Sequence, residues 1–407
     1  MLRSTLVGPL LVAVIATLTP MAMAGVAGPV SVTAPEPRPD NLALGERTQG
    51  RAVVVIEGGG SPHPYTTPWD ACDGGRATYV EALGAAGLPV FTAAGFSNTA
   101  TSTAGRAGCP PQPPLDVQWN TSGYPTQAGQ AVLGLLGYLN ATYGYTTFDL
   151  VGYSYGGIVA RAVVAALKRP AAPGSMAPAF SYEQAAIEAG VTIPTLFTMN
   201  TPHLGAPAYD VAFNPSRYEA KVTRAWGAQY ARTGRALRIF ELRGGAGAIS
   251  VLRTRGHARP NPGSWDASQV GVLDGVALTM IAGDYCGRTC GRGRLDPGPG
   301  GRVWPRTDVT VPVYSQLMLP CPERCPAPPG SVYIPPGMVP DGTVRKIFPT
   351  VHSTYETQRL GLPTTLAVSK NPVAIAYLVD TVIGHWDASG NPLQSRPHIS
   401  LPRTSRR

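Results

Sequence analysis

A single serine lies in a pattern that suits a nucleophile. Ser154 is the middle residue of Gly-Tyr-Ser-Tyr-Gly, between the apolar stretches "FDLVG" and "GGIVARAVVAALK". A strand–turn–helix of this kind holds the serine on a tight turn, and its glycines remove Cβ atoms that would collide there. The N–H groups that open the helix favour negative charge developing beside the serine. The pattern therefore predicts a nucleophile rather than a serine in an ordinary turn.

A serine nucleophile needs a base, and the base needs an acid that holds its tautomer. The chain offers six histidines: His63, His203, His257, His352, His385 and His398. Two aspartates follow apolar stretches late in the chain, Asp284 in "IAGDYCG" and Asp308 in "RTDVTVPVYS". The residue types for a Ser-Asp-His set are present, with more than one candidate for two of the roles.

Four stretches carry a resemblance to a known family: "VVVIEGGG", "GYSYGG", "NTPHLGAP" and "TDVTVPVYS". The four stretches and the order of the expected elements resemble the α/β-hydrolase superfamily, and within it the secreted bacterial lipases and esterases. The resemblance runs from about Arg51 to Trp386. The resemblance implies an α/β-hydrolase fold whose catalytic residues follow the order serine, acid, histidine.

That order assigns the base and the acid. It implies His352 as the base, because "TVHSTYE" follows the last expected strand, whereas His385 lies inside a late helix and is expected to be packed or capping. Asp308 resembles the acid of the family's Asp-x-x-Val-Pro stretch, and Asp284 is the alternative. His203 precedes both aspartates and is expected to be structural.

The oxyanion hole is expected to use two backbone N–H groups. The resemblance implies Tyr155, which follows the nucleophile, and Gly59, in the glycine loop after the first strand. Many relatives have His-Gly in this loop, whereas this chain has Glu57-Gly58-Gly59-Gly60. The alternative for these glycines is a flexible turn, and a phosphate-binding loop is disfavoured because its Lys and Ser/Thr are missing.

Strands and helices are expected to alternate around these residues, which predicts a mostly parallel sheet with helices on both faces. Thr126 and Asn371 are expected to cap two of the helices. The expected strands lie within residues 51–60, 88–95, 148–152, 191–200, 276–283 and 344–350, and the expected helices within 76–87, 126–144, 156–168 and 371–386.

Two insertions interrupt the alternation. Residues 203–275 contain "SRYEAKVTRAWGAQYARTGRALRIFELRG", which reads as a basic helix, and ten Lys or Arg lie between Arg217 and Arg259. We expect a cap whose apolar face meets lipid or acyl chains, the alternative being an ordinary solvated helical excursion. Residues 286–342 are rich in Cys, Pro and Gly and predict disulfide-stapled loops.

The termini indicate export. Residues 1–24 have the charged start, apolar run and Ala-Met-Ala end of a cleaved signal peptide, with an uncleaved membrane anchor as the alternative. A proline-rich linker, 25–50, a catalytic domain, 51–390, and a basic tail, 391–407, follow. Six cysteines suit an oxidising compartment, and neighbours along the chain could pair; zinc is the weaker alternative because no histidine has ligand spacing beside them. They are Cys72, Cys109, Cys286, Cys290, Cys321 and Cys325.

The net charge of +9 comes without a basic patch interleaved with aromatic residues, so nucleic acid is not an expected partner. We expect a monomeric secreted hydrolase that cleaves carboxylic esters, as a triacylglycerol lipase or a carboxylesterase of lipid metabolism. It would need no cofactor or metal and could contact lipid interfaces. The alternatives are an acyltransferase with the same residues and a catalytically silent surface binding module.

Overall fold

The computed structural model describes residues 50–59, 79–93, 95–96, 117–170, 181–226, 228–240, 246–254, 264–285, 297–298, 302–303, 306–320 and 333–388. The expected signal peptide, the linker up to residue 49, the basic tail and all six cysteines lie outside these residues.

Six strands form one parallel sheet, in the order β10-β7-β6-β5-β1-β2. Each lies within a range expected for a strand or overlaps it closely. Every residue of β1 is buried, as expected of a strand covered on both faces. The strands are β1 (Arg51–Ile56), β2 (Val90–Thr92), β5 (Thr147–Tyr153), β6 (Thr195–Met199), β7 (Ala277–Gly283) and β10 (Val344–Phe348).

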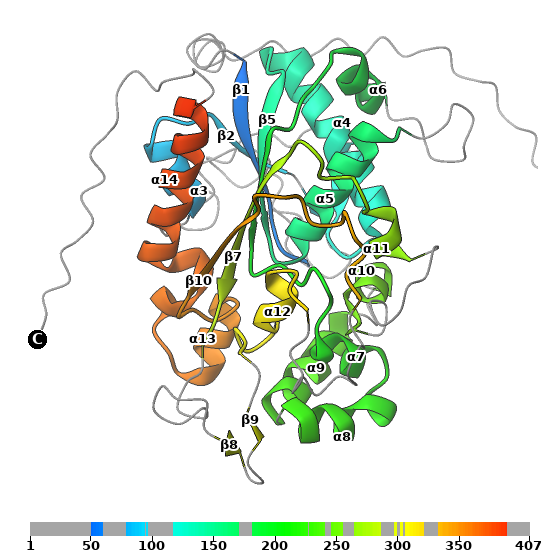
Figure 1. Cartoon of the computed structure of the whole chain (residues 1–407), viewed down its shortest axis with the longest axis vertical. Coiled ribbons are helices and arrows are strands. Elements are labelled where there is room, and N and C mark those ends of the chain that lie inside the picture. Colours follow the sequence, from blue (N-terminus) through cyan, green and yellow to red (C-terminus); the bar gives the residue numbers. More distant parts are fainter. Residues whose placement is uncertain are drawn as a thin grey trace, which may run out of the picture. The chain divides into compact units, whose positions relative to one another are not determined.

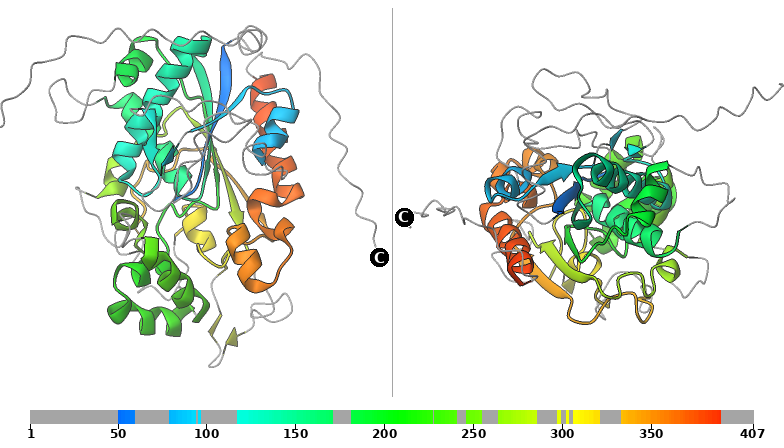
Figure 2. Two further views of the ribbon diagram at one scale, coloured as in Figure 1. Left: turned by 180° about the vertical axis from the view of Figure 1, so that it is seen from behind. Right: turned by 90° about the horizontal axis from the view of Figure 1, so that it is seen from above.

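Helices cover both faces of this sheet. The helices α3 (Tyr79–Ala85) and α14 (Pro372–Ala388) lie on one face, and α4 (Pro125–Tyr143) and α5 (Tyr155–Lys168) lie on the other (Figures 1 and 2). Side chains of β1 alternate between the two cores: Val53 and Val55 pack with α3 and α14, whereas Val54 and Ile56 pack with α4 and α5. The expected α/β fold with a mostly parallel sheet flanked by helices is confirmed.

The first residues of the helices agree only in part with those predicted from the sequence. Asn371 caps α14 as expected, because its Oδ1 accepts the N–H of Ala374 at 3.0 Å. The expectation for Thr126 is wrong: α4 begins at Pro125, and its N-cap is Tyr124, without a side-chain cap. Proline suits the first helical position because it needs no N–H partner there. Helix α6 (Ser181–Glu188), which packs on α4, was not expected.

Five helices lie between β6 and β7: α7 (Pro207–Phe213), α8 (Pro215–Trp226), α9 (Ala228–Phe240), α10 (Ala246–Leu252) and α11 (Trp265–Ser268). The basic stretch expected as one helix is thus two helices, α8 and α9. They pack on each other and on α7, and Tyr218, Val222 and Ala231 are buried. In Figure 1, α7, α8 and α9 lie beyond the carboxyl end of β7.

Short elements complete the described part of the chain. Two two-residue pairs, β3 (Gly95–Phe96) with β4 (Trp119–Asn120) and β8 (Pro297–Gly298) with β9 (Arg302–Val303), lie outside the main sheet. Helix α12 is Val313–Gln316, α13 is Thr354–Leu360, and the 3-10 turns are Thr364–Leu366 and Val368–Lys370. Among the helices that are described, none has the length and apolar character needed to cross a membrane.

Candidate active site

Ser154 occupies a strained turn between β5 and α5. Its φ of 52° and ψ of −124° are rare for any residue other than glycine and cost about 1–3 kcal/mol. Neighbouring backbone comes so close that glycine is required: a Cβ on Gly156 would lie 2.0 Å from the Ile56 carbonyl oxygen, and one on Gly152 would lie 2.5 Å from Gly157 Cα. The Gly-x-Ser-x-Gly stretch therefore forms the tight elbow that the sequence predicts.

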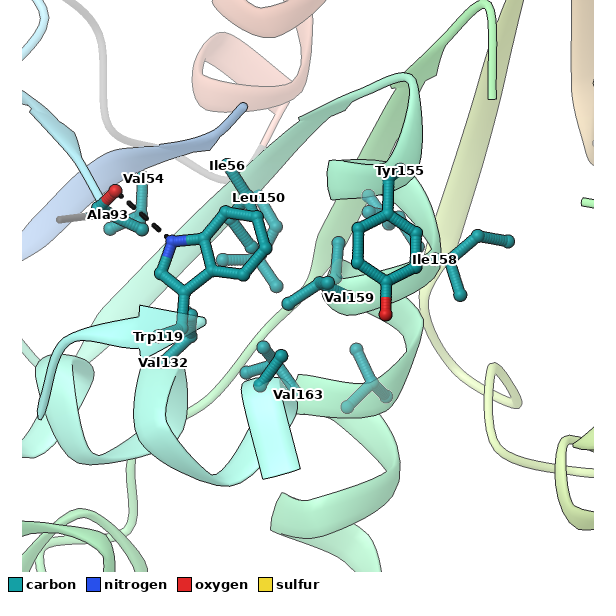
Figure 3. Packing of buried hydrophobic residues seen from close by; sticks show 14 of the residues in the cluster. Val54, Ile56, Ala93, Trp119, Val132, Leu150, Tyr155, Ile158, Val159 and Val163 are labelled. Carbon is teal, nitrogen blue, oxygen red and sulfur yellow. Dashed lines mark hydrogen bonds between the residues drawn. The ribbon is translucent and has the colours of Figure 1, made fainter. Parts of the chain in front are cut away.

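The two tyrosines beside Ser154 anchor the turn on opposite sides of the sheet. The ring of Tyr155 points into the core among Ile158 and Val159 (Figure 3), and its hydroxyl donates to the Gly123 carbonyl at 2.7 Å. Trp119 packs in the same core and donates to the Ala93 carbonyl at 3.3 Å (Figure 3). On the other side, Tyr153 donates its hydroxyl to the carbonyl of His352 at 2.7 Å. The elbow is thus tied to the loop that carries His352.

Hydrogen bonds join Ser154, His352 and Asp308 into one chain. Ser154 Oγ lies 2.8 Å from His352 Nε2, and His352 Nδ1 lies 2.7 Å from Asp308 Oδ2. Asp308 is fully buried, while Ser154 and His352 are 7% and 6% exposed. A carboxylate at Nδ1 requires a proton there, so Nε2 is left to accept the serine hydroxyl. The three residues come from different segments: the turn between β5 and α5, the stretch before α12 and the stretch before α13.

A second strained turn positions Asp308. Its Oδ1 accepts the N–H groups of Thr310 at 2.9 Å and Val311 at 2.6 Å, and its carbonyl accepts the N–H of His352 at 2.9 Å. The intervening Val309 has a φ of 84°, which is unfavourable for a β-branched residue. The alternative acid, Asp284, instead accepts from Arg306 Nε at 2.6 Å. The structure brings Asp308 to His352 and pairs Asp284 with Arg306.

Two groups at this site have raised pKa values, for different reasons. Burial works to lower the pKa of His352, but the carboxylates of Asp308 and Glu356 outweigh it and raise the pKa above its ordinary value. Burial raises the pKa of Asp308, against the opposing effect of His352 and of the two backbone N–H groups. A histidine with a raised pKa is a stronger base, which suits the removal of a serine proton.

The glycine loop after β1 lies beside the serine. A Cβ on Gly58 would be 3.2 Å from the Cβ of Ser154. Glu57 is buried, and it accepts a hydrogen bond from the hydroxyl of Tyr79 on α3. Gly59 follows at the surface. The loop that carries Gly59, the expected second oxyanion donor, therefore lies next to Ser154.

Two other histidines make contacts that suit a structural role. His203 is fully buried, with Nε2 at 3.0 Å from Thr198 Oγ1 and Nδ1 at 3.4 Å from the guanidinium of Arg161. His385 packs its ring against Phe197, with the centroids 5.7 Å apart. His63, His257 and His398 lie outside the described residues. Among the described histidines, only His352 contacts Ser154.

Two residues near the site were missed from the sequence. Glu356, on α13, is 4% exposed, and its charge acts on His352. Tyr209, on α7, is 6% exposed; burial first, and then the charges of Glu356 and Asp308, raise its pKa. The spacing Ser353-x-x-Glu356 is a capping-box signal that could have drawn attention to Glu356. No cluster of three or more potential metal ligands occurs within the described part of the chain.

Residues 130–247 match the family model described as "Putative serine esterase (DUF676)". This segment is less than half of the chain and contains Ser154 but neither Asp308 nor His352. No curated protein matches the sequence. The family match confirms the resemblance to serine esterases.

Several solved structures are similar to this chain at low identity. The mature form of Bacillus licheniformis lipase BlEst2 is 11% identical, with a TM-score of 0.39 over 80% of this chain and 90% of that one. A lipase-esterase related protein from Clostridium acetobutylicum is 9% identical, with a TM-score of 0.37 over 83% and 94%. Brefeldin A esterase, described as a bacterial homologue of human hormone sensitive lipase, is 14% identical, with a TM-score of 0.36 over 82% and 67%.

Proposed function

We propose that this protein hydrolyses carboxylic esters through an acyl-enzyme intermediate on Ser154. The observation that carries the proposal is the hydrogen-bonded chain from Ser154 Oγ through His352 to Asp308, with the serine on a strained elbow. His352 takes the serine proton as Oγ attacks the ester carbonyl, and Asp308 stabilises the resulting imidazolium. The alcohol leaves with that proton, and a water molecule repeats the steps to release the acid.

The oxyanion that forms during attack requires N–H donors. We assign the backbone N–H of Tyr155, at the start of α5, and that of Gly59. The N-terminus of α5 favours negative charge beside Ser154, and the closeness of Gly58 to Ser154 supports a donor from the glycine loop. Tyr155 is held in place by its buried ring, so the donor would need little reorganisation during the reaction.

The first experiment is hydrolysis of a series of p-nitrophenyl esters, from acetate to palmitate, by the wild-type protein and by Ser154→Ala. Serine-dependent release at any chain length supports the proposal, and its absence throughout the series contradicts it for these esters. A rate that rises with chain length indicates a lipase, and a short-chain optimum indicates a carboxylesterase. Adding an acceptor alcohol and analysing the products separates acyl transfer from hydrolysis, because both reactions use the same acyl-enzyme.

The helices between β6 and β7 suit a cap that works at lipid interfaces. Arg359 of α13, the helix that follows His352, donates to Thr233 Oγ1 of α9 at 3.0 Å. Helices α8 and α9 have one acidic residue, Glu219, against six exposed cations. The cations are Arg217, Lys221, Arg224, Arg232, Arg235 and Arg238. Such a surface is attracted to anionic headgroups.

Vesicle binding tests this contact. Binding to vesicles with anionic lipid should exceed binding to zwitterionic vesicles and fall when Arg217, Lys221 and Arg224 are changed to Glu. The control reverses three cations outside these helices, the exposed Arg345 and Lys346 and the half-buried Lys370. Equal losses in both variants would point to net charge alone. An increase in the hydrolysis rate when the ester exceeds its solubility and forms a lipid–water interface would support movement of the cap.

Export is also part of the proposal. The apolar run and the Ala-Met-Ala end of residues 1–24 support signal-peptide cleavage before Gly25, followed by disulfide formation among the six cysteines. Mass spectrometry of the secreted protein, alkylated with and without reduction, tests both points. Cleavage after Ala24 and no alkylation without reduction are expected. An intact N-terminus or six free thiols would contradict this part of the proposal.

A further inference from the structure

Glu356 is a buried carboxylate with hydrogen bonds at both of its oxygens. Its Oε1 accepts the hydroxyl of Thr310 at 2.7 Å, and its Oε2 accepts the hydroxyl of Ser353. Two hydroxyl donors are the partners that an ionised carboxylate requires when it is buried. The side chain is 4% exposed and lies in the first turn of α13.

The two partners belong to the two loops that meet at the site. Thr310 donates its backbone N–H to Asp308 at 2.9 Å and its hydroxyl to Glu356, so this single residue contacts both carboxylates. Ser353 follows His352 directly and is the N-cap of α13, where its hydroxyl oxygen accepts the N–H of Tyr355 at 3.2 Å. Glu356 thus connects the Asp308 turn to the His352 loop.

Helix capping alone does not account for this arrangement. In a capping box the glutamate accepts the backbone N–H of the N-cap residue. Glu356 accepts the hydroxyl of Ser353 instead, and its other oxygen binds Thr310, which is 46 residues distant in the chain. The Thr310 contact adds nothing to the cap, but it restrains the turn in which Val309 has a φ of 84°.

We propose that Glu356 is a positioning residue for ester hydrolysis: it holds the Asp308 turn against the His352 loop and adds a second negative charge beside His352. This inference rests on the proposed function. Among the described residues, Asp308, Glu356 on α13 and Tyr153 on β5 are the titratable groups that face His352; Tyr209 on α7 interacts with the two carboxylates, and Glu57 interacts with Tyr153. Of these, Asp308 and Glu356 are the carboxylates that act on the imidazole, and they stabilise the imidazolium that catalysis requires.

The test is the pH dependence of kcat/KM for a soluble p-nitrophenyl ester in wild type and Glu356→Gln. Without the charge the imidazolium is less stable, so the acid limb should move to lower pH by up to about one unit. On the plateau, kcat should fall roughly threefold to tenfold. Glu183→Gln removes another mostly buried carboxylate, from α6, and should change neither quantity. An acid limb that stays in place in Glu356→Gln would overturn the electrostatic role.

A second pair of variants separates the contact from the charge and also serves if Glu356→Gln does not fold. Thr310→Val removes the bridging hydroxyl and retains the carboxylate, so kcat should fall while the acid limb stays in place; Thr310→Ser should restore kcat. Wild-type kcat in Thr310→Val would overturn the positioning role.

Titration of the His352 ring by NMR in Ser154→Ala, with and without Glu356→Gln, needs no turnover. A lower pKa in the double variant supports the inference, and equal values contradict it. If the wild-type protein hydrolysed none of the esters, the proposed function would be refuted, but this titration would remain valid.

Discussion

The Nδ1 atom of His352 lies 2.7 Å from Oδ2 of Asp308, although 44 positions separate the two residues in the chain. Asp284, which follows β7 directly, is instead the partner of Arg306. The contact is supported by the N–H of His352, which donates to the carbonyl of Asp308 at 2.9 Å. The base and the acid are therefore held by backbone as well as by side chains.

Asp308→Asn should lower kcat far more than Asp284→Asn. An amide at position 308 can donate to Nδ1, which favours the tautomer with the proton on Nε2, where Ser154 needs an acceptor. A loss on the order of 10⁴-fold is expected in Asp308→Asn, whereas Asp284→Asn should stay near wild type. Steady-state kinetics on one soluble ester would measure both; a comparable loss in the two variants would contradict the assignment.

The activity should require pH values above the ordinary pKa of histidine. Asp308 and Glu356 outweigh burial and raise the pKa of His352 above 6.5. The imidazole must be neutral to accept the serine proton, so kcat/KM should be low when the ring is protonated and rise as pH increases through the raised pKa. The midpoint of the acid limb is expected above pH 6.5, and a midpoint at or below that value would show that burial dominates.

Gly156→Ala should prevent the elbow from forming. The added Cβ would lie 2.0 Å from the Ile56 carbonyl oxygen and 2.4 Å from that of Glu57, both of which are fixed in or beside the sheet. We expect loss of soluble folded protein or of esterase activity. Gly84→Ala, on an exposed position of α3 with nothing within 4 Å, is the matched control and should leave both unchanged. Active, stable Gly156→Ala protein would contradict the geometry of the turn.

Removing the charge of Asp149 should destabilise the fold without changing the chemistry. Asp149 is fully buried on β5 and accepts two hydrogen bonds of 2.8 Å from Arg51, with further donors from Thr195 and Trp386. Asp149→Leu leaves a buried, unpaired guanidinium and should cost about 3–5 kcal/mol in the free energy of unfolding.

The double variant Arg51→Met/Asp149→Leu removes both charges and should recover much of that loss. Denaturant unfolding measures stability, and kcat per folded molecule should stay the same in all variants, since the pair lies towards the amino ends of β1 and β5. A double variant as unstable as Asp149→Leu would show that the hydrogen bonds to Thr195 and Trp386, rather than the unpaired charge, dominate.

Much of the sheet could be predicted from the sequence because each strand is a short apolar run that is buried on both faces. The ends of the helices were harder to predict from the sequence. Thr126 has a capping side chain, but Pro125 already fits the first turn, so α4 begins one residue earlier with Tyr124 as its N-cap. The division of the basic stretch into α8 and α9 was also missed, because it depends on how both helices pack on α7.

The sequence alone determined the position of the candidate nucleophile. The elbow at Ser154 is signalled by the glycines at 152 and 156: a Cβ on Gly152 would meet Gly157 within the turn, and a Cβ on Gly156 would meet the backbone of β1 at Ile56. The choice between Asp284 and Asp308, and the participation of Glu356, were decided only by the tertiary structure. These contacts depend on where distant segments meet: Glu356 lies near Asp308 because α13 packs beside a turn that is 46 residues away at Thr310. Local sterics can be read from neighbouring residues, whereas the path of the chain between two loops cannot.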